Sequence, residues 1–367
     1  MKKKTIVIHG ATNTSNFGDV LFAELFFKRI KSNGDQAAFL KWPKYGVCKY
    51  VADYVGSTDN AGLFSLPDVD AVVMMSSGYF GDSPNKNKFI EGIRRIARYF
   101  FPIILFVLAG KHLLILGVGG GPLYSKLSRS FACFLMNRAK VVTVRDIETK
   151  NFFVSYGVKR HIDVTSDTAL VLVNDVKNNT DKTHKEKENI IFVHLVPGLF
   201  YTEEMKMKII PAINKFITDV ENSAIVLGFD CIVNNDSYDL VNKELLPLIA
   251  TNNKTVVKYS DPQQLCKILC KSKLIITMKL HVGIVGAAYG NSVLSFPLHD
   301  EKTPRFYRQI GEENRCVPLA LLNDNIVYDL MKTFYDKPIH IPNTLVEAAE
   351  RNLQLLDCRS FEIKKSD

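Results

Sequence analysis

The chain of 367 residues has few features that would organise disulfides or a metal centre. Its seven cysteines are scattered, no two form a Cys-x-x-Cys pair, and no spacing between them recurs. A disulfide framework and a zinc site are therefore not expected, and we predict reduced thiols. Cys266 and Cys270 lie four residues apart on a predicted helix, where we expect them to pack in the core. Because no cluster of metal ligands is visible, we predict no metal and no cofactor.

Long hydrophobic runs are lacking as well. The most apolar stretch, residues 99–116, is interrupted by Pro102 and by the pair Lys111-His112, so its pieces are shorter than the ~20 residues of a membrane span. The basic residues 1–4 precede an apolar segment that is too short for a secretory signal. These absences predict a cytoplasmic protein without a membrane-spanning helix.

Motifs for nucleotide phosphates are incomplete. Segments 76–82 and 117–122 place glycines after predicted strands, but neither contains a Walker lysine or a full Gly-x-Gly-x-x-Gly. Tight turns explain such glycines about as well as close approach of the backbone to an anion does. Basic residues also do not cluster with aromatic ones into a recognised nucleic-acid module, so we expect no nucleic-acid partner.

The composition is that of a folded protein with a positive charge. Apolar residues make up 47% of the chain and charged residues 23%, with a mean hydropathy of +0.02. Lysine and arginine number 47 against 38 aspartate and glutamate, which gives a net charge of +9. This balance suits acidic ligands or an anionic membrane surface. At ~100–200 residues per domain, the length favours two domains.

Short β-rich apolar runs alternate with amphipathic helical segments along the chain. The predicted strands are residues 5–8, 71–75, 113–116, 141–144, 190–195, 224–228, 256–259, 274–277 and 292–296. This alternation predicts α/β domains with parallel sheets and helices on both faces. A polar, charged stretch lies near the middle. We therefore predict an N-terminal Rossmann-like domain, a linker, a second such domain and a C-terminal helix with a tail, at residues 1–178, 179–189, 190–342 and 343–367.

Ligands of such sheets bind at the carboxyl ends of the strands, so loops that face the cleft between the domains hold the candidate residues. In the loop after the first strand, Asn16 and Asp19 have two interpretations. Their spacing is that of a helix-capping box, and their side chains could instead offer polar groups to a hydroxyl-rich ligand. Arg145 follows the strand at 141–144 directly. It can capture a carboxylate or phosphate in bidentate fashion, or it pairs with Asp146 or another acid.

The strongest constellation lies between residues 275 and 305. A strand ends, a short turn presents Lys279 and His281, and a helix begins at once. The helix N-terminus adds oriented N–H groups, which favour an anion. Lys302 follows the next strand, and because successive strands of such a unit are usually neighbours, its loop is expected beside the first. A lone histidine is more often a core residue, but the cationic neighbours of His281 favour a function here.

The motifs together resemble the polysaccharide pyruvyl transferase family over nearly the whole chain. The segment 16–19 (Asn-Phe-Gly-Asp) is similar to the Asn-x-Gly-Asp loop of that family, and Lys279-Leu280-His281 with Lys302 is similar to its Arg-Leu-His segment and downstream lysine. Segments 144–146, 156–158 and 166–170 match its arginine strand, Gly-Val turn and Asp-x-Ala-Leu signature. The departures are Lys279 for arginine, which keeps the charge but loses the bidentate fork, Ser76-Ser77 for glycine, and Thr168 for proline.

The resemblance implies a GT-B-like fold, in which two Rossmann-like domains with parallel sheets face a central cleft. It implies transfer of pyruvate from phosphoenolpyruvate onto a hexose of a surface polysaccharide or of its lipid-linked repeat unit, as a cyclic ketal with release of phosphate. Carried over to this chain, the donor-binding residues are Arg145, Lys279, His281 and Lys302. Those expected near the acceptor are Asn16, Asp19 and Asp82, with His281 and Asp19 as the catalytic residues.

Two other functions compete with this hypothesis. A nucleotide-sugar-dependent glycosyltransferase of the same architecture would use the segment 283–302 for its donor, but Ala287-Ala288 stand where an acidic residue would hold the ribose. A catalytically silent glycan-binding or scaffold protein would keep the fold without turnover.

The stretch 88–108 suggests a membrane contact. Basic residues at Lys88, Arg94, Arg95 and Arg98 alternate with apolar and aromatic ones, a composition that suits a helix lying on the inner face of a membrane. A core helix with a solvated basic face accounts for the same pattern.

Overall fold

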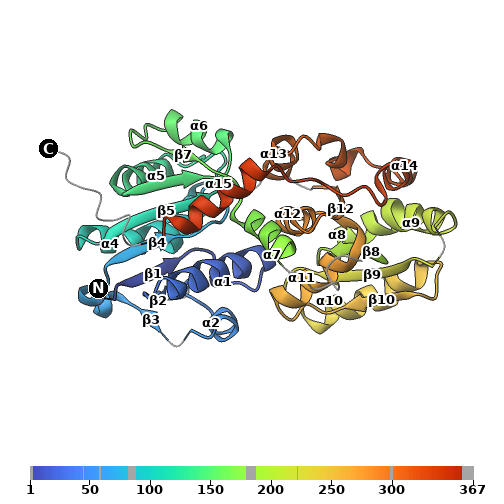
Figure 1. The fold of residues 1–367 in the computed structure, drawn as a ribbon, viewed down its shortest axis with the longest axis horizontal. Helices are drawn as coiled ribbons and strands as arrows, with labels where there is room; N and C mark the ends of the chain where they lie inside the picture. Colours follow the sequence, from blue (N-terminus) through green and yellow to red (C-terminus); the bar gives the residue numbers. More distant parts are fainter. Residues whose placement is uncertain are drawn as a thin grey trace. The chain divides into compact units, whose positions relative to one another are not determined.

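The computed structural model describes residues 3–43, 45–57, 59–81, 88–178, 187–220, 222–297 and 301–357. The chain forms two compact units, of which the first comprises Met1–Thr168 with Thr344–Asp367 and the second Ala169–Asn343 (Figure 1). The sequence-based boundary lies later, at a linker spanning 179–189. Residues 169–178 belong to the second unit, the C-terminal helix belongs to the first, and 179–186 lie outside the described residues.

The first unit is built on a parallel sheet of seven strands in the order β3-β2-β1-β4-β5-β6-β7. Its strands are β1 (Thr5–His9), β2 (Gln36–Leu40), β3 (Asn60–Ala61), β4 (Ala71–Met74), β5 (His112–Val118), β6 (Val141–Val144) and β7 (Asp163–Val164). The four central strands that the apolar runs predict are confirmed. The sequence did not predict β2, which two alanines make weakly apolar, or the two-residue strands β3 and β7.

Helical segments alternate with the strands of this unit, and some of them begin at a polar side-chain cap. The helical segments are α1 (Phe17–Ser32), α2 (Lys49–Val55), η1 (Leu63–Asp68), α3 (Lys88–Arg95), η2 (Ile96–Phe100), α4 (Phe101–Leu108), α5 (Lys126–Arg138), α6 (Ile147–Ser155) and α15 (Asn343–Gln354). Before α6, for example, Asp146 Oδ1 accepts from the backbone N–H of Thr149 at 2.7 Å. Among the described residues, no helix has the length and apolar character needed to cross a bilayer.

The C-terminal helix α15 belongs to the first unit (Figure 1). It is tied to that unit by Asn352, which is fully buried. Its Nδ2 donates to the carbonyl of Ser166 at 3.1 Å and to Thr168 Oγ1 at 3.0 Å. Its Oδ1 accepts from Thr143 Oγ1 at 2.7 Å and from Thr165 Oγ1 at 3.0 Å. One amide therefore satisfies polar groups around the end of β6 and the segment that follows β7.

We expect Asn352→Leu to lower the free energy of unfolding by about 2 kcal/mol, because it leaves several buried hydroxyl and carbonyl groups without their partner. Urea denaturation followed by circular dichroism measures this loss. Gln354→Leu on the exposed side of α15 is the matched control and is expected to change little. Equal stability of both variants and the wild type would contradict the assignment.

The second unit contains a parallel sheet of five strands in the order β10-β9-β8-β11-β12. These are β8 (Glu188–Leu195), β9 (Ala224–Phe229), β10 (Lys254–Val257), β11 (Ser272–Thr277) and β12 (Ser292–Ser295). All five were predicted, although β10 lies two residues earlier than expected. The helical segments are α7 (Leu172–Asn178), α8 (Leu199–Glu204), η5 (Met205–Ile209), α9 (Ile210–Ile217), α10 (Asn235–Leu240), η6 (Val241–Leu245), α11 (Pro262–Lys271), α12 (Leu280–Ala288), α13 (Lys302–Gln309) and α14 (Asp324–Phe334).

In each sheet, successive strands are first added outward on one side and later strands are added on the other side. This change of side lies between β1 and β4 in the first sheet and between β8 and β11 in the second. At such a switch point the loops after the two strands diverge, which opens a crevice at the carboxyl ends where α/β proteins bind ligands. In each unit, the residues at this point are therefore the candidates for a ligand site.

Candidate functional site

In the first unit, a hydrogen bond spans the switch point between β1 and β4. Ser77 Oγ, which follows β4, donates to Asp19 Oδ1 in the first turn of α1 at 2.9 Å. Asn16 occupies the N-cap position of α1, but its side chain makes no capping hydrogen bond. The capping-box interpretation of this loop is therefore not realised in its side chains, and Asp19 is oriented toward the switch point instead. Asp82, the third predicted acceptor residue, lies outside the described residues.

A buried histidine and a cationic side chain lie along the same edge of the first sheet. His9, the last residue of β1, makes a hydrogen bond from Nε2 to the carbonyl of Tyr99 at 3.2 Å. Burial lowers the pKa of His9 to about 4, an effect that the Tyr99 carbonyl opposes and Arg98 reinforces. Arg98 itself donates to Asn13 Oδ1 in the loop after β1. His9 is thus a neutral structural group, whereas Arg98 and Asn13 shape the loop.

Arg145 follows β6 as predicted, but its guanidinium is buried among acids. Its Nη1 lies 3.2 Å from Asp167 Oδ2 and its Nε lies 3.7 Å from Asp146 Oδ2. A Cβ placed on Gly119 would come within 2.5 Å of the guanidinium carbon, so a larger residue there would displace the guanidinium. The ion-pair interpretation of Arg145 is confirmed, and its role toward a donor remains a prediction.

In the second unit, three polar side chains meet at the switch point. His194 lies near the end of β8, Asp230 directly follows β9, and Lys279 follows β11 as the N-cap residue of α12. Asp230 Oδ1 is 3.2 Å from His194 Nε2, and Asp230 Oδ2 is 3.5 Å from Lys279 Nζ. Asp230 and His194 are buried, whereas the Lys279 side chain is 38% exposed. The carboxylate therefore anchors a cation whose outer part is open to solvent.

Sequence reasoning missed His194 and Asp230. Both are polar residues within or directly after an apolar strand (Phe192-Val193-His194 and Gly228-Phe229-Asp230), at the edge where ligands are expected. This position at the carboxyl end of a strand is the sequence signal that could have identified both residues. Burial raises the pKa of Asp230, but His194 and Lys279 outweigh burial and lower the pKa to about 2.

This depressed pKa has a consequence for stability. Because the pKa in the folded protein lies below the ordinary 3.8, the ionised carboxylate stabilises the fold above pH ~4, and this stabilisation is lost as the pH falls toward 2. We expect Asp230→Asn to be less stable than the wild type by on the order of 2 kcal/mol at pH 7, with a gap that closes toward pH 2. Urea unfolding across this pH range measures it, with the exposed Asp239→Asn as control. A gap that is independent of pH would contradict the ion pairs.

His281 and Lys302 lie at the amino-terminal ends of neighbouring helices of this unit. His281 is half-buried in the first turn of α12, and the half-buried Lys302 is the first residue of α13, which packs against α12. The strands before these helices, β11 and β12, pair directly, so the predicted pairing of successive strands is confirmed. At Gly283 a Cβ would lie 2.8 Å from the hydroxyl of buried Tyr307, so a larger residue in the first turn of α12 would require Tyr307 to shift.

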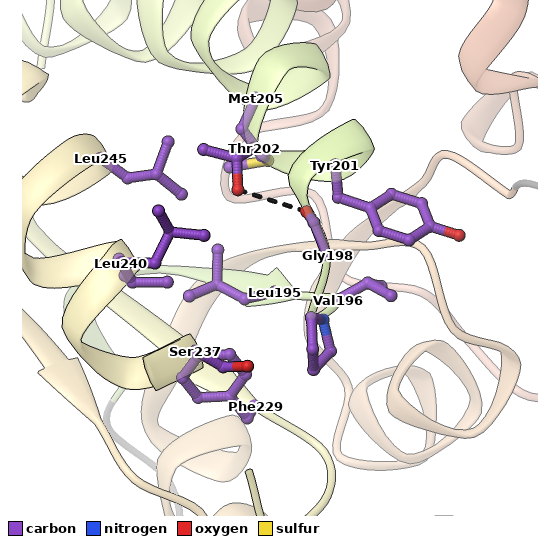
Figure 2. Close-up of a pocket in the computed structure, with 12 residues that line it drawn as sticks. Leu195, Val196, Gly198, Tyr201, Thr202, Met205, Phe229, Ser237, Leu240 and Leu245 are labelled. Carbon is purple, nitrogen blue, oxygen red and sulfur yellow. Dashed lines mark hydrogen bonds between the residues drawn. The ribbon is translucent and has the colours of Figure 1, made fainter. Parts of the chain in front are cut away.

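A small pocket lies beside the ends of β8 and β9 in the second unit (Figure 2). Its lining is mostly apolar, with Leu195, Phe229 and Leu245 among the side chains that point into it. The hydroxyl of Thr202 donates a hydrogen bond to the carbonyl of Gly198 at 3.3 Å. No charged residue and none of the sequence-predicted site residues lines this pocket, so it does not suit an anionic ligand.

The described residues contain no group of three or more His, Cys, Asp or Glu side chains that could hold a metal ion. Six cysteines lie in the described part of the chain, and none of the six is in a disulfide. At the carboxyl edges of the two sheets the structure places carboxylates, ammonium and guanidinium groups, and the imidazoles of His9, His194 and His281.

Comparison with known proteins identifies the family to which the chain is similar and the fold that it shares with solved structures. The sequence model of a family described as polysaccharide pyruvyl transferase matches residues 16–299, which is most of the chain. No curated protein sequence matches.

Among solved structures, the chain is similar to a putative UDP-N-acetylglucosamine 2-epimerase from Listeria monocytogenes, with a TM-score of 0.66, 15% identity, and coverage of 100% of this chain and 99% of that one. It is also similar to S. aureus MnaA in a co-structure with UDP (TM-score 0.63, 13% identity, coverage 100% and 99%). A third similar structure is MurG from Acinetobacter baumannii (TM-score 0.54, 16% identity, coverage 96% and 95%). At these identities the similarity shows the fold, which is α/β of the GT-B type, as predicted.

Proposed function

Since the chain belongs to the polysaccharide pyruvyl transferase family, we propose that it transfers pyruvate from phosphoenolpyruvate to a hexose residue, forming a cyclic ketal and releasing phosphate. The acceptor is a surface polysaccharide or its lipid-linked repeat unit. One observation carries the choice of donor: Lys279 and Lys302 begin two helices that pack against each other and follow neighbouring strands, with His281 beside Lys279.

The electrostatics of this arrangement suit phosphoenolpyruvate, which carries a phosphate and a carboxylate. Two ammonium groups and two helix N-termini present positive charge at the carboxyl edge of the second sheet. Asp230 fixes the Lys279 ammonium from the buried side, so that the lysine is positioned before the donor arrives. Preorganised cations of this kind stabilise the charge of a departing phosphate without a metal ion.

The reaction requires two additions of oxygen to the same carbon. One sugar hydroxyl adds to the central carbon of phosphoenolpyruvate while the methylene carbon takes up a proton and becomes a methyl group. The carbon–oxygen bond to phosphate then breaks, and a second hydroxyl of the sugar closes the ring. The two hydroxyl groups lose one proton each. One of these protons accounts for the proton gained by the methyl group, and the other leaves with phosphate.

Two residues are proposed to move these protons. An imidazole is the side chain that most often acts as a general acid or base, and that of His281 lies beside Lys279, one of the cations that would hold the donor. Asp19, oriented by Ser77, is proposed as the base toward the acceptor hydroxyl, and Asn16 as an acceptor ligand in the same loop. Arg145 is proposed to add positive charge for the donor in addition to its ion pair with Asp167.

The direct test incubates the purified protein with phosphoenolpyruvate and a panel of hexosides, with phosphate release and product mass as readouts. We expect equimolar phosphate and a pyruvyl ketal on at least one glycoside. Phosphate release without a sugar product, or no turnover on any acceptor, would contradict the proposal.

The glycosyltransferase alternative is tested by binding. The co-structure of MnaA contains UDP, so a nucleotide is a reasonable competing ligand for this fold. In this chain, however, Ala287 and Ala288 are buried in α12 and provide no carboxylate for a ribose. We expect phosphoenolpyruvate to raise the melting temperature and UDP-N-acetylglucosamine to leave it unchanged. The reverse result would favour the alternative.

A further inference from the structure

The first unit carries a group of exposed apolar side chains on consecutive helical segments. On α3, Phe89, Ile90 and Ile93 are 69%, 46% and 47% exposed. On α4, Phe101 and Leu108 are 44% and 70% exposed. The π-helical segment η2 joins these two helices without a break in the chain. We call these five side chains the apolar face.

The opposite side of the same segments is part of the core, so the apolar face does not result from poor packing. Phe100, Ile103 and Phe106 are fully buried in the hydrophobic cluster of the first unit. On α3, a Cβ at Gly92 would lie 2.7 Å from Ser125 Oγ, which places that side of the helix against the start of α5. Residues four or seven positions apart share a side of a helix, as Phe89 and Ile93 do on α3 and Phe101 and Leu108 on α4. Each helix therefore has one buried side and one exposed apolar side.

The charge of the protein is concentrated in this unit. By the division of the chain, the first unit contains 27 Lys and Arg against 18 Asp and Glu, whereas the second contains 20 of each. The whole net charge of +9 therefore belongs to the unit that carries the apolar face. Close to that face, Arg94 is 66% exposed beside Glu91, and exposed Lys126 begins α5 next to Leu127, which is 49% exposed.

We propose that the apolar face is a docking surface for an anionic lipid bilayer. Exposed aromatic and aliphatic side chains enter the boundary between headgroups and acyl chains, while the basic unit is attracted to anionic headgroups. The helices lie in the interface and do not span it, which agrees with their length and interruption by η2. This inference stands independently of the proposed reaction, because it rests on exposure and charge alone.

Binding of the apolar face to a bilayer is distinguished from binding to a protein partner by its dependence on lipid charge and on salt. A second copy of the chain would bury the same apolar side chains, but it would bring the same positive charge to the contact, so repulsion opposes that arrangement. A bilayer rich in phosphatidylglycerol offers the opposite charge. Binding should therefore weaken as the ionic strength rises and as the anionic lipid is removed.

The test is co-sedimentation of the full-length protein with vesicles of phosphatidylcholine alone and of phosphatidylcholine mixed with phosphatidylglycerol. We expect binding to the mixed vesicles at low salt, and a decrease of about tenfold or more in the triple variant Phe89→Ser, Ile93→Ser, Leu108→Ser. The control variant Met207→Ser, Leu321→Ser removes side chains that are 59% and 67% exposed in the second unit, and it should bind like the wild type.

Melting temperatures show whether both variants fold. If the wild type does not sediment with anionic vesicles at low salt, or if the triple variant binds as well as the control, the proposal is overturned. A dimer in sedimentation velocity that the triple variant abolishes, without binding to vesicles, would assign the face to a second copy and overturn it equally.

Discussion

Replacing His281 by glutamine is expected to lower the rate of pyruvyl transfer by about 10²–10⁴-fold, because a positioned proton donor or acceptor contributes roughly this factor. Glutamine keeps the size and polarity of the side chain but cannot exchange a proton near neutral pH. Because His281 is half-buried in the first turn of α12, its replacement should disturb the packing of the core little. The melting temperature should therefore stay within about a degree or two of the wild type. Initial rates of phosphate release at saturating phosphoenolpyruvate measure the effect.

The control for this variant is His161→Gln. His161 is exposed in the first unit and pairs only at the surface with Asp163, so its replacement should leave both rate and stability unchanged. Full activity of His281→Gln would remove the imidazole from the mechanism. Loss of activity together with loss of the fold would show that His281 is a structural residue, as lone histidines often are.

Replacing Arg145 by methionine is expected to destabilise the first unit by about 3–5 kcal/mol, because the change leaves Asp167 and Asp146 buried without their cation. This loss does not depend on any donor. It is measured by urea unfolding in the absence of ligand, with Arg138→Met at the exposed end of α5 as control.

The double variant Arg145→Met, Asp167→Leu separates the two roles of Arg145. Removing both charges of the closest pair should recover part of the stability, since Asp146 is then the one carboxylate of the two that lacks the Arg145 cation. If Arg145 also binds the donor, the recovered fold will still bind phosphoenolpyruvate more weakly than the wild type. A single variant as stable as the wild type would contradict the buried ion pair.

The sequence predicted the architecture because its central strands are buried on both sides and are therefore nearly continuous apolar runs. Strand β2 was missed because its alanines give a weak signal, and β3 and β7 because two residues are too few for any pattern. The boundary between the units was misplaced because a polar stretch marks exposure to solvent, whereas the division depends on which sheet a segment packs against. The same limit applies to α15, whose place is fixed by hydrogen bonds between Asn352 and residues 209 and 187 positions away.

The candidate site was predictable in part. Residues in loops after strands, such as Asp19, Lys279 and Lys302, are found from the strand pattern alone. The partners that orient them are not, because Ser77 and Asp230 come from other strands and are brought close only by the strand order. Arg145 shows the converse, since its type and position fit an anion site while its actual neighbours are two carboxylates.

A crystal structure of the protein with phosphoenolpyruvate bound would test the central claim most directly. We expect the ligand at the carboxyl edge of the second sheet, with its acidic groups within hydrogen-bonding distance of Lys279 and Lys302 and with His281 in contact. Density for phosphoenolpyruvate elsewhere, with these three side chains contacting only protein atoms, would contradict it.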